Sequence, residues 1–296
     1  MSKQRVTVLG LGIMGGGMAS RLLEMKFPLT VCNRNREKAE RFAKMGASCA
    51  NSPREAAANA DVIISMVADD DASRAMWLGD GGALAGSAAE SVLVESSTLT
   101  VRWAKELSAI AAREKRDFVD APVTGTKPHA ASGELVFLAG GSAAAVEKAR
   151  PVLSVLGRDV VHLGANGSGA LLKLINNFLC GVQAASLAEA SALISAAGLD
   201  EGKALSVLTN GAPGSPLVKS VSTRAASNDP TIYFALKLMA KDLRYAIEAG
   251  ADNRLALQTA LAALEIFQKA ITSGHGNEDL SAVVNALKPT PAKRSA

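Results

Sequence analysis

Residues 5–15 read RVTVLGLGIMG, a short apolar, β-branched run that passes directly into glycines spaced as G-x-G-x-x-G. Apolar residues then recur at helical spacing over residues 14–25, which predicts a helix. A strand, this glycine pattern and a helix in that order are the context that a dinucleotide-binding fingerprint requires. Gly10 would allow a tight turn, Gly12 would let the backbone approach a pyrophosphate, and Gly15 would let the helix pack close to the strand. The helix start would offer free N–H groups to the phosphates, and an ordinary glycine-rich turn is the alternative.

The residues after the second predicted strand bear on which dinucleotide would bind. That strand, residues 29–33, ends in Asn33, where an acid that binds the two ribose hydroxyls of NAD is typical. Arg34 follows, and its guanidinium offers the planar, charge-assisted donors that suit a 2′-phosphate, which Lys38 could also reach. The sequence therefore predicts a preference for NADP(H). NAD(H) remains possible because Asn33 could bind a ribose, and a solvated helix start is the alternative for Arg34, Arg36 and Lys38.

Length and composition indicate a globular protein of one large or two ordinary domains. The chain has 296 residues, of which 48% are hydrophobic and 20% charged, and its formal net charge is +4. Lys and Arg are scattered, which does not indicate nucleic acid but suits an anionic cofactor and substrate. Cys32, Cys49 and Cys180 lack metal-ligand spacing, so we expect buried free thiols in a reducing compartment and no metal site. We expect no signal peptide and no uninterrupted apolar stretch of membrane-spanning length, and therefore a cytoplasmic protein without membrane contact.

Strand and helix patterns alternate as far as residue 162 and then give way to helical patterns alone. Continuous apolar runs such as residues 62–67 are typical of strands buried in a parallel sheet. A long helix is predicted over residues 170–197, closed by Gly198. The fold class expected is an α/β Rossmann-type domain with a doubly wound, mainly parallel sheet, joined by this long interdomain helix to an all-α domain. The expected domains are a cofactor-binding domain, residues 1–163, a helical substrate and oligomerisation domain, residues 164–288, and a disordered tail, residues 289–296.

Polar residues near the start of the long helix are the first candidates for chemistry. Lys173, Asn176 and Asn177 occupy positions i, i+3 and i+4, so they share one helical face. A lysine and two amides are costly to bury without partners, which favours a site over a solvated stripe. Partial burial lowers the pKa of a lysine and lets it pass a proton near neutral pH, as the reduction of a carbonyl requires.

The loop after the strand predicted over residues 117–123 is the second candidate. Loops at the carboxyl ends of parallel strands are where ligands bind in such sheets. Thr124, Gly125 and Thr126 offer hydroxyls and backbone N–H groups that suit a carboxylate, and Lys127 could add charge. A structural turn is the alternative interpretation.

Four blocks occur in the order found in one enzyme family: GLGIMGGGMA (10–19), DAPVTGTKPHAASGEL (120–135), GSGALLKLINN (167–177) and KLMAKDLRYA (237–246). The chain resembles the β-hydroxyacid dehydrogenases, which include 3-hydroxyisobutyrate dehydrogenase, tartronate semialdehyde reductase and the glyoxylate/succinic semialdehyde reductases. GTKP and the FALK of residues 234–237 look most like the last subgroup, which is similar to this chain in using Asn-Arg for NADPH. The resemblance implies reversible, NADPH-dependent reduction of a short oxo acid or semialdehyde to the hydroxy acid.

The resemblance also implies a role for individual residues. Lys173 would be the proton donor, and Asn177 would bind or orient the substrate. Thr124 stands where the family usually has serine, which keeps the hydroxyl and tightens the pocket, and Phe234 would line that pocket. The catalytic candidates are Lys173 and Asn177. The substrate-binding candidates are Thr124, Gly125, Thr126, Asn176, Phe234 and Asp242. The cofactor-binding candidates are Gly10, Leu11, Gly12, Ile13, Met14, Gly15, Asn33, Arg34, Asn35, Lys38, Val67, Ala68, Thr98 and Lys241.

Other readings of the same motifs are possible. Imine reductases share the glycine block and the two-domain outline, but they usually lack a lysine at the position of Lys173. The 6-phosphogluconate dehydrogenases share the fold but are larger, and a non-catalytic NADP-binding protein would have no use for a proton donor. The small-molecule partner expected is an oxo or hydroxy acid. The apolar faces of the alanine-rich helices predict a homodimer or homotetramer, unless those faces pack only within the chain.

Overall fold

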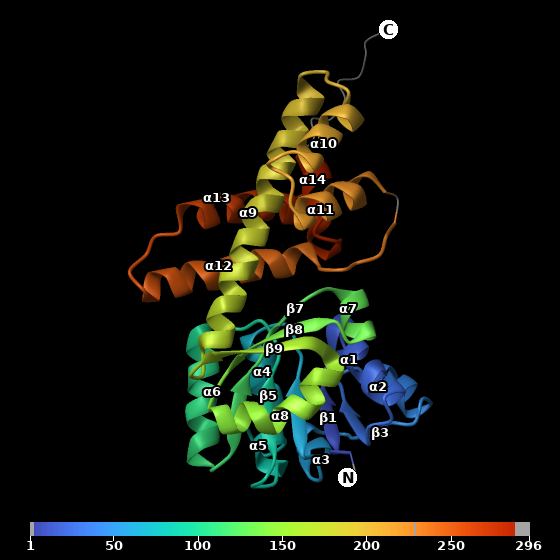
Figure 1. Ribbon diagram of the computed structural model, residues 1–296, viewed down its shortest axis with the longest axis vertical. Helices are drawn as coiled ribbons and strands as arrows, with labels where there is room; N and C mark the ends of the chain where they lie inside the picture. Colours follow the sequence, from blue (N-terminus) through green and yellow to red (C-terminus); the bar gives the residue numbers. More distant parts are fainter. Residues whose placement is uncertain (1–2, 228, 288–296) are drawn as a thin grey trace. The chain divides into compact units, whose positions relative to one another are not determined.

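The computed structural model describes residues 3–227 and 229–287, and it divides into two compact units (Figure 1). Unit 1 is Met1–Lys173 and unit 2 is Leu174–Ala296. The division falls inside one continuous helix, α9 (Ser168–Ala196), whereas the sequence placed the end of the first domain at residue 163. The predicted tail, residues 289–296, lies outside the described residues.

Unit 1 is built on a nine-stranded sheet of order β3-β2-β1-β4-β5-β6-β8-β7, with β9 paired to β8. The strands from β3 to β6 in this order run parallel, β8 is antiparallel to β6 and β7, and β9 is parallel to β8. The doubly wound, mainly parallel sheet expected from the sequence is thereby confirmed. The strands are β1 (Val6–Leu9), β2 (Leu29–Cys32), β3 (Ser48–Cys49), β4 (Val62–Ser65), β5 (Val92–Glu95), β6 (Asp117–Asp120), β7 (Val123–Thr124), β8 (Leu135–Gly140) and β9 (Gly157–Gly164).

The central strands are largely apolar because both faces of the sheet are covered. On β4, Val62 and Ile64 belong to one core cluster, which includes Met18 of α1 (Ile13–Glu24). Ile63 belongs to a second cluster, which includes Trp103 of α6 (Val101–Arg113). Successive side chains of a strand point to opposite faces, so a strand buried on both sides is a nearly continuous apolar run in the sequence. This is why the apolar runs in the sequence predict the central strands well.

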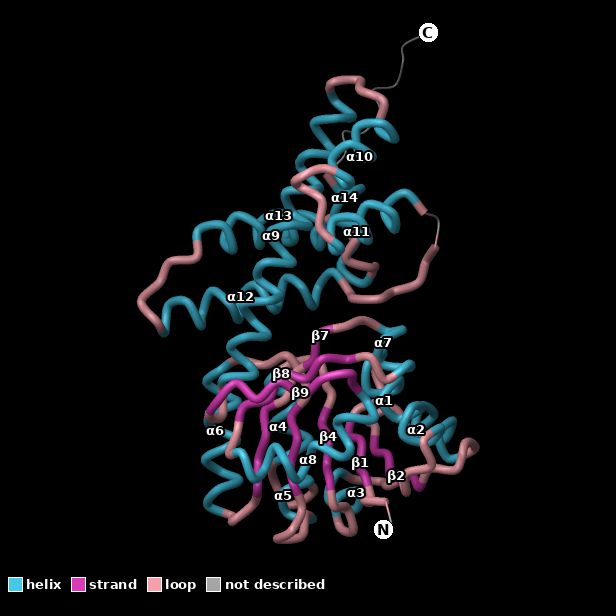
Figure 2. The backbone as a smooth tube through the Cα atoms, viewed as in Figure 1, coloured by secondary structure: helices cyan, strands magenta, loops and turns pink. Residues whose placement is uncertain are grey.

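The helices of unit 1 include four that the sequence analysis did not predict, α3, α4, α5 and α7. These four are short, and each lies in a connection between strands, as Figure 2 shows. The helices are α1 (Ile13–Glu24), α2 (Arg36–Ala43), α3 (Pro53–Ala57), α4 (Asp70–Trp77), α5 (Ala83–Gly86), α6 (Val101–Arg113), α7 (Lys127–Ser132) and α8 (Ala143–Leu156).

The strand predicted over residues 117–123 is interrupted at residues 121 and 122. Strand β6 ends at Asp120, and β7 begins at Val123 and pairs antiparallel with β8. Pro122 lies between them and has no N–H to donate to a neighbouring strand, so the ladder is interrupted there. Asp120 and β7 both pair antiparallel with β8, so the chain continues along β8 after this interruption, and the predicted substrate loop follows.

The described residues of unit 2 form helices and connecting loops without a strand, apart from an isolated bridge between Ala235 and Asp279, which confirms the expected all-α region. Its core contains many alanines, such as Ala184 and Ala188 of α9, together with Phe267 of α13. Small side chains of this kind let helices approach one another closely. The helices after α9 are α10 (Glu201–Asn210), α11 (Pro216–Ala226), α12 (Leu236–Asp252), α13 (Gln258–Thr272), the 3₁₀ helix η1 (His275–Asn277) and α14 (Ala282–Ala286).

Two expectations from composition need correction. Cys32 is buried, but Cys180 is half-buried and Cys49 is exposed, because β3 is a two-residue strand at the edge of the sheet. Helix α9 is long and apolar enough to cross a membrane by length and composition, which the sequence analysis did not foresee. Such a helix is weak evidence for a membrane span, since the core helix of a globular protein has the same length and composition.

Candidate functional site

The glycine loop between β1 and α1 has no room for side chains at its two ends. Gly10 has φ +92°, and a Cβ there would lie 2.4 Å from the carbonyl oxygen of Met66. A Cβ on Gly15 would lie 2.1 Å from the carbonyl oxygen of Gly10. A Cβ on Gly12, in contrast, would have no atom within 4 Å. The loop is thus tight against the protein at both ends and open at its centre, which is where a ligand backbone or pyrophosphate could approach.

The start of α1 carries no cap of its own. Its N-cap residue is Gly12, which has no side chain to accept a hydrogen bond, and the first turn has no acidic residue. The first N–H groups of a helix have no partner within the helix, so they and the helix dipole attract an anion. Leu11, Ile13 and Met14 flank this uncapped start. The residues therefore fit a dinucleotide phosphate.

The segment after β2 is fixed to the glycine loop by Asn33. Its Oδ1 accepts the N–H of Leu11 at 2.8 Å, and its Nδ2 donates to the carbonyl oxygen of Asn35 at 2.8 Å. The side chain that was a candidate ribose ligand is thus engaged in holding two loops together. Asn35 accepts the N–H of Lys38 at 3.4 Å as the N-cap of α2. Arg34 is exposed at this corner.

The loops after β4 and β5 are joined through one buried carboxyl, that of Glu95. Its Oε2 accepts hydrogen bonds from Ser73 Oγ at 2.6 Å and from Trp77 Nε1 at 2.8 Å, and its Oε1 accepts the N–H of Ser97 at 2.9 Å. Ser97 Oγ in turn accepts the N–H of Val67 at 2.8 Å. A single network therefore sets the spacing of two loops at the carboxyl edge of the sheet.

Val67, Ala68 and Thr98, all cofactor candidates, lie on these two loops. Burial raises the pKa of Glu95 above its ordinary value, although the surrounding donors oppose the rise. Sequence reasoning missed Glu95. The signal that could have found it is an acid at the end of an otherwise apolar strand, where a charge is tolerated only with partners.

The predicted substrate loop is ordered by its neighbours. Gly125 has φ +123°, and a Cβ there would lie 2.9 Å from Leu135 Cδ2. His129 Nδ1 lies 3.1 Å from the backbone nitrogen of Thr126 and 3.0 Å from its Oγ1, so the Thr126 hydroxyl already has a partner. Thr124 is half-buried at the end of β7. Thr124 and the backbone of Gly125 are therefore the more available groups of the three.

Asp120 closes β6 and connects that strand to the start of α9. Its Oδ1 accepts the N–H of Gly167 at 2.8 Å, and its Oδ2 accepts the N–H of Ala170 at 2.9 Å. Asn166 Nδ2 adds a longer bond to Oδ1 at 3.3 Å. Lys173 follows in the next turn of α9 and is half-buried. Sequence reasoning quoted Asp120 within a motif but gave it no role.

The stability of the protein should depend on pH through Asp120. Burial raises the pKa of this carboxyl from 3.8 to about 6, although hydrogen bonds from Gly167, Ala170 and Asn166 oppose the rise. The folded protein thus binds this proton more tightly than the unfolded chain, so the contribution is fully present below about pH 4 and is lost as pH rises through about 6. From pH 7 to pH 4 we expect wild type to gain up to about 3 kcal/mol relative to Asp120→Asn.

Urea unfolding at a series of pH values measures this difference. Asp117→Asn is the matched control, because Asp117 lies on the same strand but pairs with Lys148 in a partly exposed ion pair. Parallel stability curves for wild type and Asp120→Asn between pH 4 and 7 would contradict the expectation.

A second polar cluster lies within unit 2 and contains several candidates. Asn177 Nδ2 donates to Asp242 Oδ2 at 2.5 Å, and Asp242 Oδ1 lies 3.0 Å from Lys241 Nζ. Lys241 Nζ also lies 4.5 Å from the centroid of the Tyr245 ring. Asn176 Nδ2 donates to Asn177 Oδ1 at 2.9 Å. Helices α9 and α12 are thereby joined by buried polar side chains, which predicts a fixed orientation for Asn177.

Phe234 precedes α12 and packs against the core of unit 2. Its N–H and that of Tyr233 both donate to Asp279 Oδ2, at 3.1 and 2.9 Å. Although burial by itself would raise the pKa of Asp279, bonds from Ser281, Phe234 and Tyr233 keep it below the ordinary value. The position of Phe234 is thus set by a buried carboxylate rather than by packing alone.

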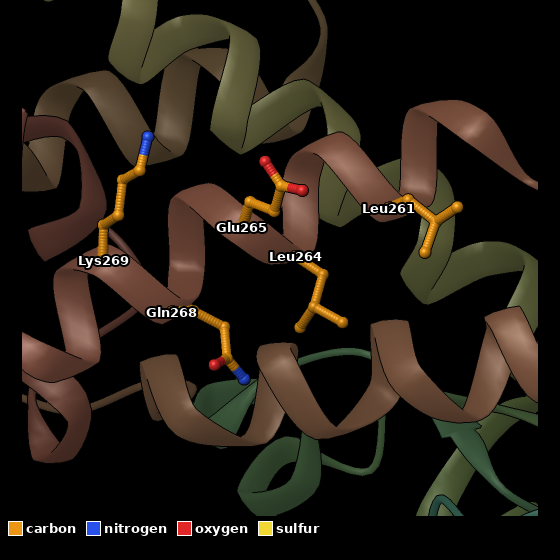
Figure 3. A pocket seen from close by; sticks show the side chains of 5 residues that line it. All are labelled: Leu261, Leu264, Glu265, Gln268 and Lys269. Atoms are coloured by element: carbon orange, nitrogen blue, oxygen red, sulfur yellow. The ribbon is translucent and has the colours of Figure 1, made fainter.

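One cavity of about 480 Å³ lies along α13 (Figure 3). Its lining is drawn from this one helix, and none of the predicted site residues contributes to it. The lining residues are Leu261, Leu264, Glu265, Gln268 and Lys269. Without a titratable pair or a convergent set of polar groups from a second element, this cavity does not indicate chemistry.

The cofactor candidates are brought together by the topology of unit 1. Gly10 follows β1, Asn33 follows β2, Val67 follows β4 and Thr98 follows β5. These four strands are neighbours in the order β2-β1-β4-β5 and are parallel, so their carboxyl ends meet at one edge. Such an edge, where the connections change direction, is where nucleotides bind in doubly wound sheets.

Comparisons with known proteins cover nearly the whole chain. The family described as NAD binding domain of 6-phosphogluconate dehydrogenase matches residues 5–164, and NAD-binding of NADP-dependent 3-hydroxyisobutyrate dehydrogenase matches residues 167–287. The chain is 34% identical over 295 residues to the NAD-dependent L-serine dehydrogenase of Pseudomonas aeruginosa, covering 97% of this chain and 99% of that protein. It is 33% identical over 283 residues to glyoxylate/succinic semialdehyde reductase 1 of Arabidopsis thaliana, covering 96% and 98%. A 3-hydroxyisobutyrate dehydrogenase structure from Salmonella typhimurium superposes with TM-score 0.87 at 30% identity, covering 96% and 99%.

Proposed function

Because the chain belongs to the NAD(P)-dependent β-hydroxyacid dehydrogenases related to 3-hydroxyisobutyrate dehydrogenase, we propose that it reduces a short oxo acid or semialdehyde with NADPH. The product is the hydroxy acid, the reaction is reversible, and the substrate is of the glyoxylate or succinic semialdehyde class. The observation that carries the proposal is Lys173, a half-buried amine in an apolar helix whose first turn is bonded to Asp120. The loop that offers Thr124 and Gly125 begins directly after that same aspartate.

The residues of this chain act on the substrate as follows. The backbone N–H of Gly125 and the hydroxyl of Thr124 bind the substrate carboxylate, with Thr126 shaping the loop through its contact with His129. Lys173 Nζ donates a proton to the carbonyl oxygen as negative charge develops on it, and accepts one in the reverse direction. Asn177 has one amide hydrogen committed to Asp242, and its second remains able to orient the substrate oxygen.

The glycine loop and the uncapped start of α1 fit a dinucleotide, as does the joined pair of loops at Val67 and Thr98. The cofactor, when bound, supplies hydride transfer to the carbonyl carbon. Asn35 and Lys38 form the start of α2, and we place this helix start beside the adenosine end of the cofactor. As the family resemblance implies, we assign Asn176, Phe234 and Asp242 to substrate binding. Lys241 is assigned to cofactor binding.

Arg34 is expected to decide the choice between NADPH and NADH. An exposed guanidinium at the end of β2 can form charge-assisted bonds to a 2′-phosphate, and such bonds contribute about 1.5–3 kcal/mol. Arg34→Ala should therefore raise the KM for NADPH about 10- to 100-fold and leave the KM for NADH nearly unchanged.

Steady-state kinetics with both cofactors measure this effect. Arg36→Ala is the matched control, because Arg36 pairs with Glu40 and Asn51 and should leave both KM values within about twofold. A wild-type enzyme that prefers NADH, as the name of the Pseudomonas relative says of that protein, would contradict the proposed preference.

The substrate class is tested by NADPH oxidation with glyoxylate, succinic semialdehyde, tartronate semialdehyde, methylmalonate semialdehyde and a cyclic imine in parallel. Oxidation of L-serine and of L-threonate with NADP⁺ and NAD⁺ completes the panel, since relatives are named for those substrates. Turnover of glyoxylate or succinic semialdehyde supports the proposal. Turnover of the imine alone would indicate an imine reductase, and tight NADPH binding without any turnover would indicate a non-catalytic binder.

We further propose that the protein is a cytoplasmic homodimer or homotetramer. Ile175, Leu179 and Leu193 of α9 lie on one helical face and are 44%, 52% and 70% exposed. Exposed large apolar side chains on one face of a long helix favour an association surface. Sedimentation equilibrium at micromolar concentration distinguishes the oligomers from a monomer.

A further inference from the structure

Asp120 is a buried group that the proposed reaction does not use directly, yet it connects the two segments that do. Strand β6 ends at this residue, and the loop with Thr124 begins after it. Both of its carboxyl oxygens accept backbone N–H groups from the start of α9, at Gly167 and Ala170. The donor of the acid–base step, Lys173, lies one turn beyond Ala170. The predicted substrate loop and the helix turn before Lys173 are therefore both attached at Asp120.

We propose that Asp120 is a positioning residue, which holds the first turn of α9 at the end of β6 and so sets the distance between Lys173 and the Thr124–Gly125 loop. This inference rests on the proposed function for Lys173. A bidentate contact to two amides of one helical turn fixes both the position and the rotation of the helix start. Since misplacement by about 1 Å can cost about 100-fold in rate, a fixed helix start has direct value for proton transfer.

The surroundings of Asp120 are shaped for this carboxylate. A Cβ on Gly140 would lie 2.7 Å from Asp120 Oδ1, and a Cβ on Gly169 would lie 3.0 Å from Oδ2 and 2.1 Å from the carbonyl oxygen of Leu138. Asn166 donates to Asp120 and to the carbonyl oxygens of Phe118 and Gly140, at 3.3, 3.1 and 3.1 Å. The cradle therefore excludes a longer acid and leaves asparagine as the variant of equal size.

The two backbone N–H groups bond more strongly to the ionised carboxylate than to the neutral acid, although the cost of burying the charge makes the whole folded protein more stable when Asp120 is protonated. Burial raises the pKa of Asp120 to about 6, so ionisation is nearly complete only above neutral pH. Three other titratable groups belong to the surrounding elements. Glu95 lies opposite on β5, Lys105 of α6 lies against Gly167, and His162 Nε2 of β9 lies 2.9 Å from the carbonyl oxygen of Gly141. The contribution of Asp120 to the pH profile is therefore isolated by comparing the profile of wild type with that of an Asp120 variant.

The test compares Asp120→Asn with the control Asp117→Asn in the full-length protein. Hydrogen exchange followed by mass spectrometry measures protection of residues 166–171, and steady-state kinetics measure kcat, the substrate KM and their pH profiles. Asparagine keeps the shape but turns an NH₂ group toward one of the two amides. We expect faster exchange of this segment, a fall in kcat of about 10- to 100-fold at unchanged Kd for NADPH, and loss of the wild-type decline in kcat below about pH 6.

Each outcome decides the inference. Unchanged exchange of residues 166–171 overturns it whatever the activity, and so does faster exchange with wild-type kcat, KM and pH profile. A purely structural role would lower the melting temperature without altering the pH profile of kcat, which also counts against it. Gly169→Ala, which crowds the same cradle, provides a second variant and should shift kcat in the same direction. Absence of turnover in wild type would instead overturn the proposed function, and the exchange result would remain a separate measurement.

Discussion

Replacing Lys173 with alanine is expected to lower kcat by about 10²- to 10⁴-fold, the range contributed by a positioned acid or base. The proton acceptor is the substrate oxygen, which gains negative charge in reduction, and no other amine is proposed within reach of it. Because Lys173 lies on α9 and the glycines proposed to bind the phosphates lie on the β1–α1 loop, the Kd for NADPH should stay within about threefold of wild type. Stopped-flow and steady-state kinetics, with NADPH fluorescence for binding, measure both quantities.

Two further variants make the result specific. Lys173→Met keeps the apolar stem of the side chain and its helix propensity while removing the amine, so its kcat should fall as far as that of the alanine variant. Lys203→Ala removes an exposed lysine of α10, whose ammonium lies 3.6 Å from Asp200, and should retain wild-type kcat. If Lys173→Met kept kcat within about threefold of wild type, the proton donor would have to be another group, and the proposed mechanism would be wrong.

The central strands could be predicted from sequence because burial on both faces leaves a continuous apolar signal. The apolar run of residues 62–67 contains β4, Val62–Ser65, and α9 lies within one or two residues of its prediction. The short helix α4 was missed although Asp69 accepts the N–H of Ala72 as its N-cap, since its eight residues start with acids and give little apolar periodicity. The edge strand β3 was missed for a related reason, because two exposed residues carry no pattern.

The residues of the candidate site also differ in whether they could be predicted from sequence. The glycine loop could be found because spacing and context are local, and each glycine conformation follows from neighbours a few residues away or from one adjacent strand. Glu95 and Asp120 could not be assigned, because their partners Ser73 and Gly167 lie 22 and 47 residues away and meet them only in the folded chain. Asn33 shows the limit most clearly. Sequence offered it as a ribose ligand, and the fold uses its side chain to tie the glycine loop to β2.

Single alanine substitutions in the glycine loop should separate the stability of unit 1 from its affinity for NADPH. Gly15→Ala would place a Cβ 2.1 Å from the carbonyl oxygen of Gly10, both of them backbone-fixed positions. Helix α1 would have to move away from β1, and overpacking of this kind costs about 1–3 kcal/mol of unfolding free energy. The displaced helix start would also weaken NADPH binding, so stability and affinity should fall together.

Gly12→Ala should behave differently. Gly12 has φ −72°, which alanine adopts readily, and its Cβ would meet no atom within 4 Å. The unfolding free energy should stay within about 0.5 kcal/mol of wild type. The added methyl group would occupy the space through which a pyrophosphate approaches the backbone, so the Kd for NADPH should rise about 10- to 100-fold.

Gly16→Ala, one residue after Gly15 and inside α1, completes the comparison. Its Cβ would make only an ordinary contact, 3.8 Å from Phe42 Cζ, and alanine is favoured over glycine within a helix by about 0.5–1 kcal/mol. We therefore expect a slightly more stable protein with wild-type affinity. Denaturant unfolding and fluorescence titration with NADPH on the three variants give the pattern. Neither added methyl group clashes with the protein itself, so a difference in affinity between the two variants must come from the ligand. If Gly12→Ala bound NADPH as tightly as Gly16→Ala, the pyrophosphate would not pass over this loop.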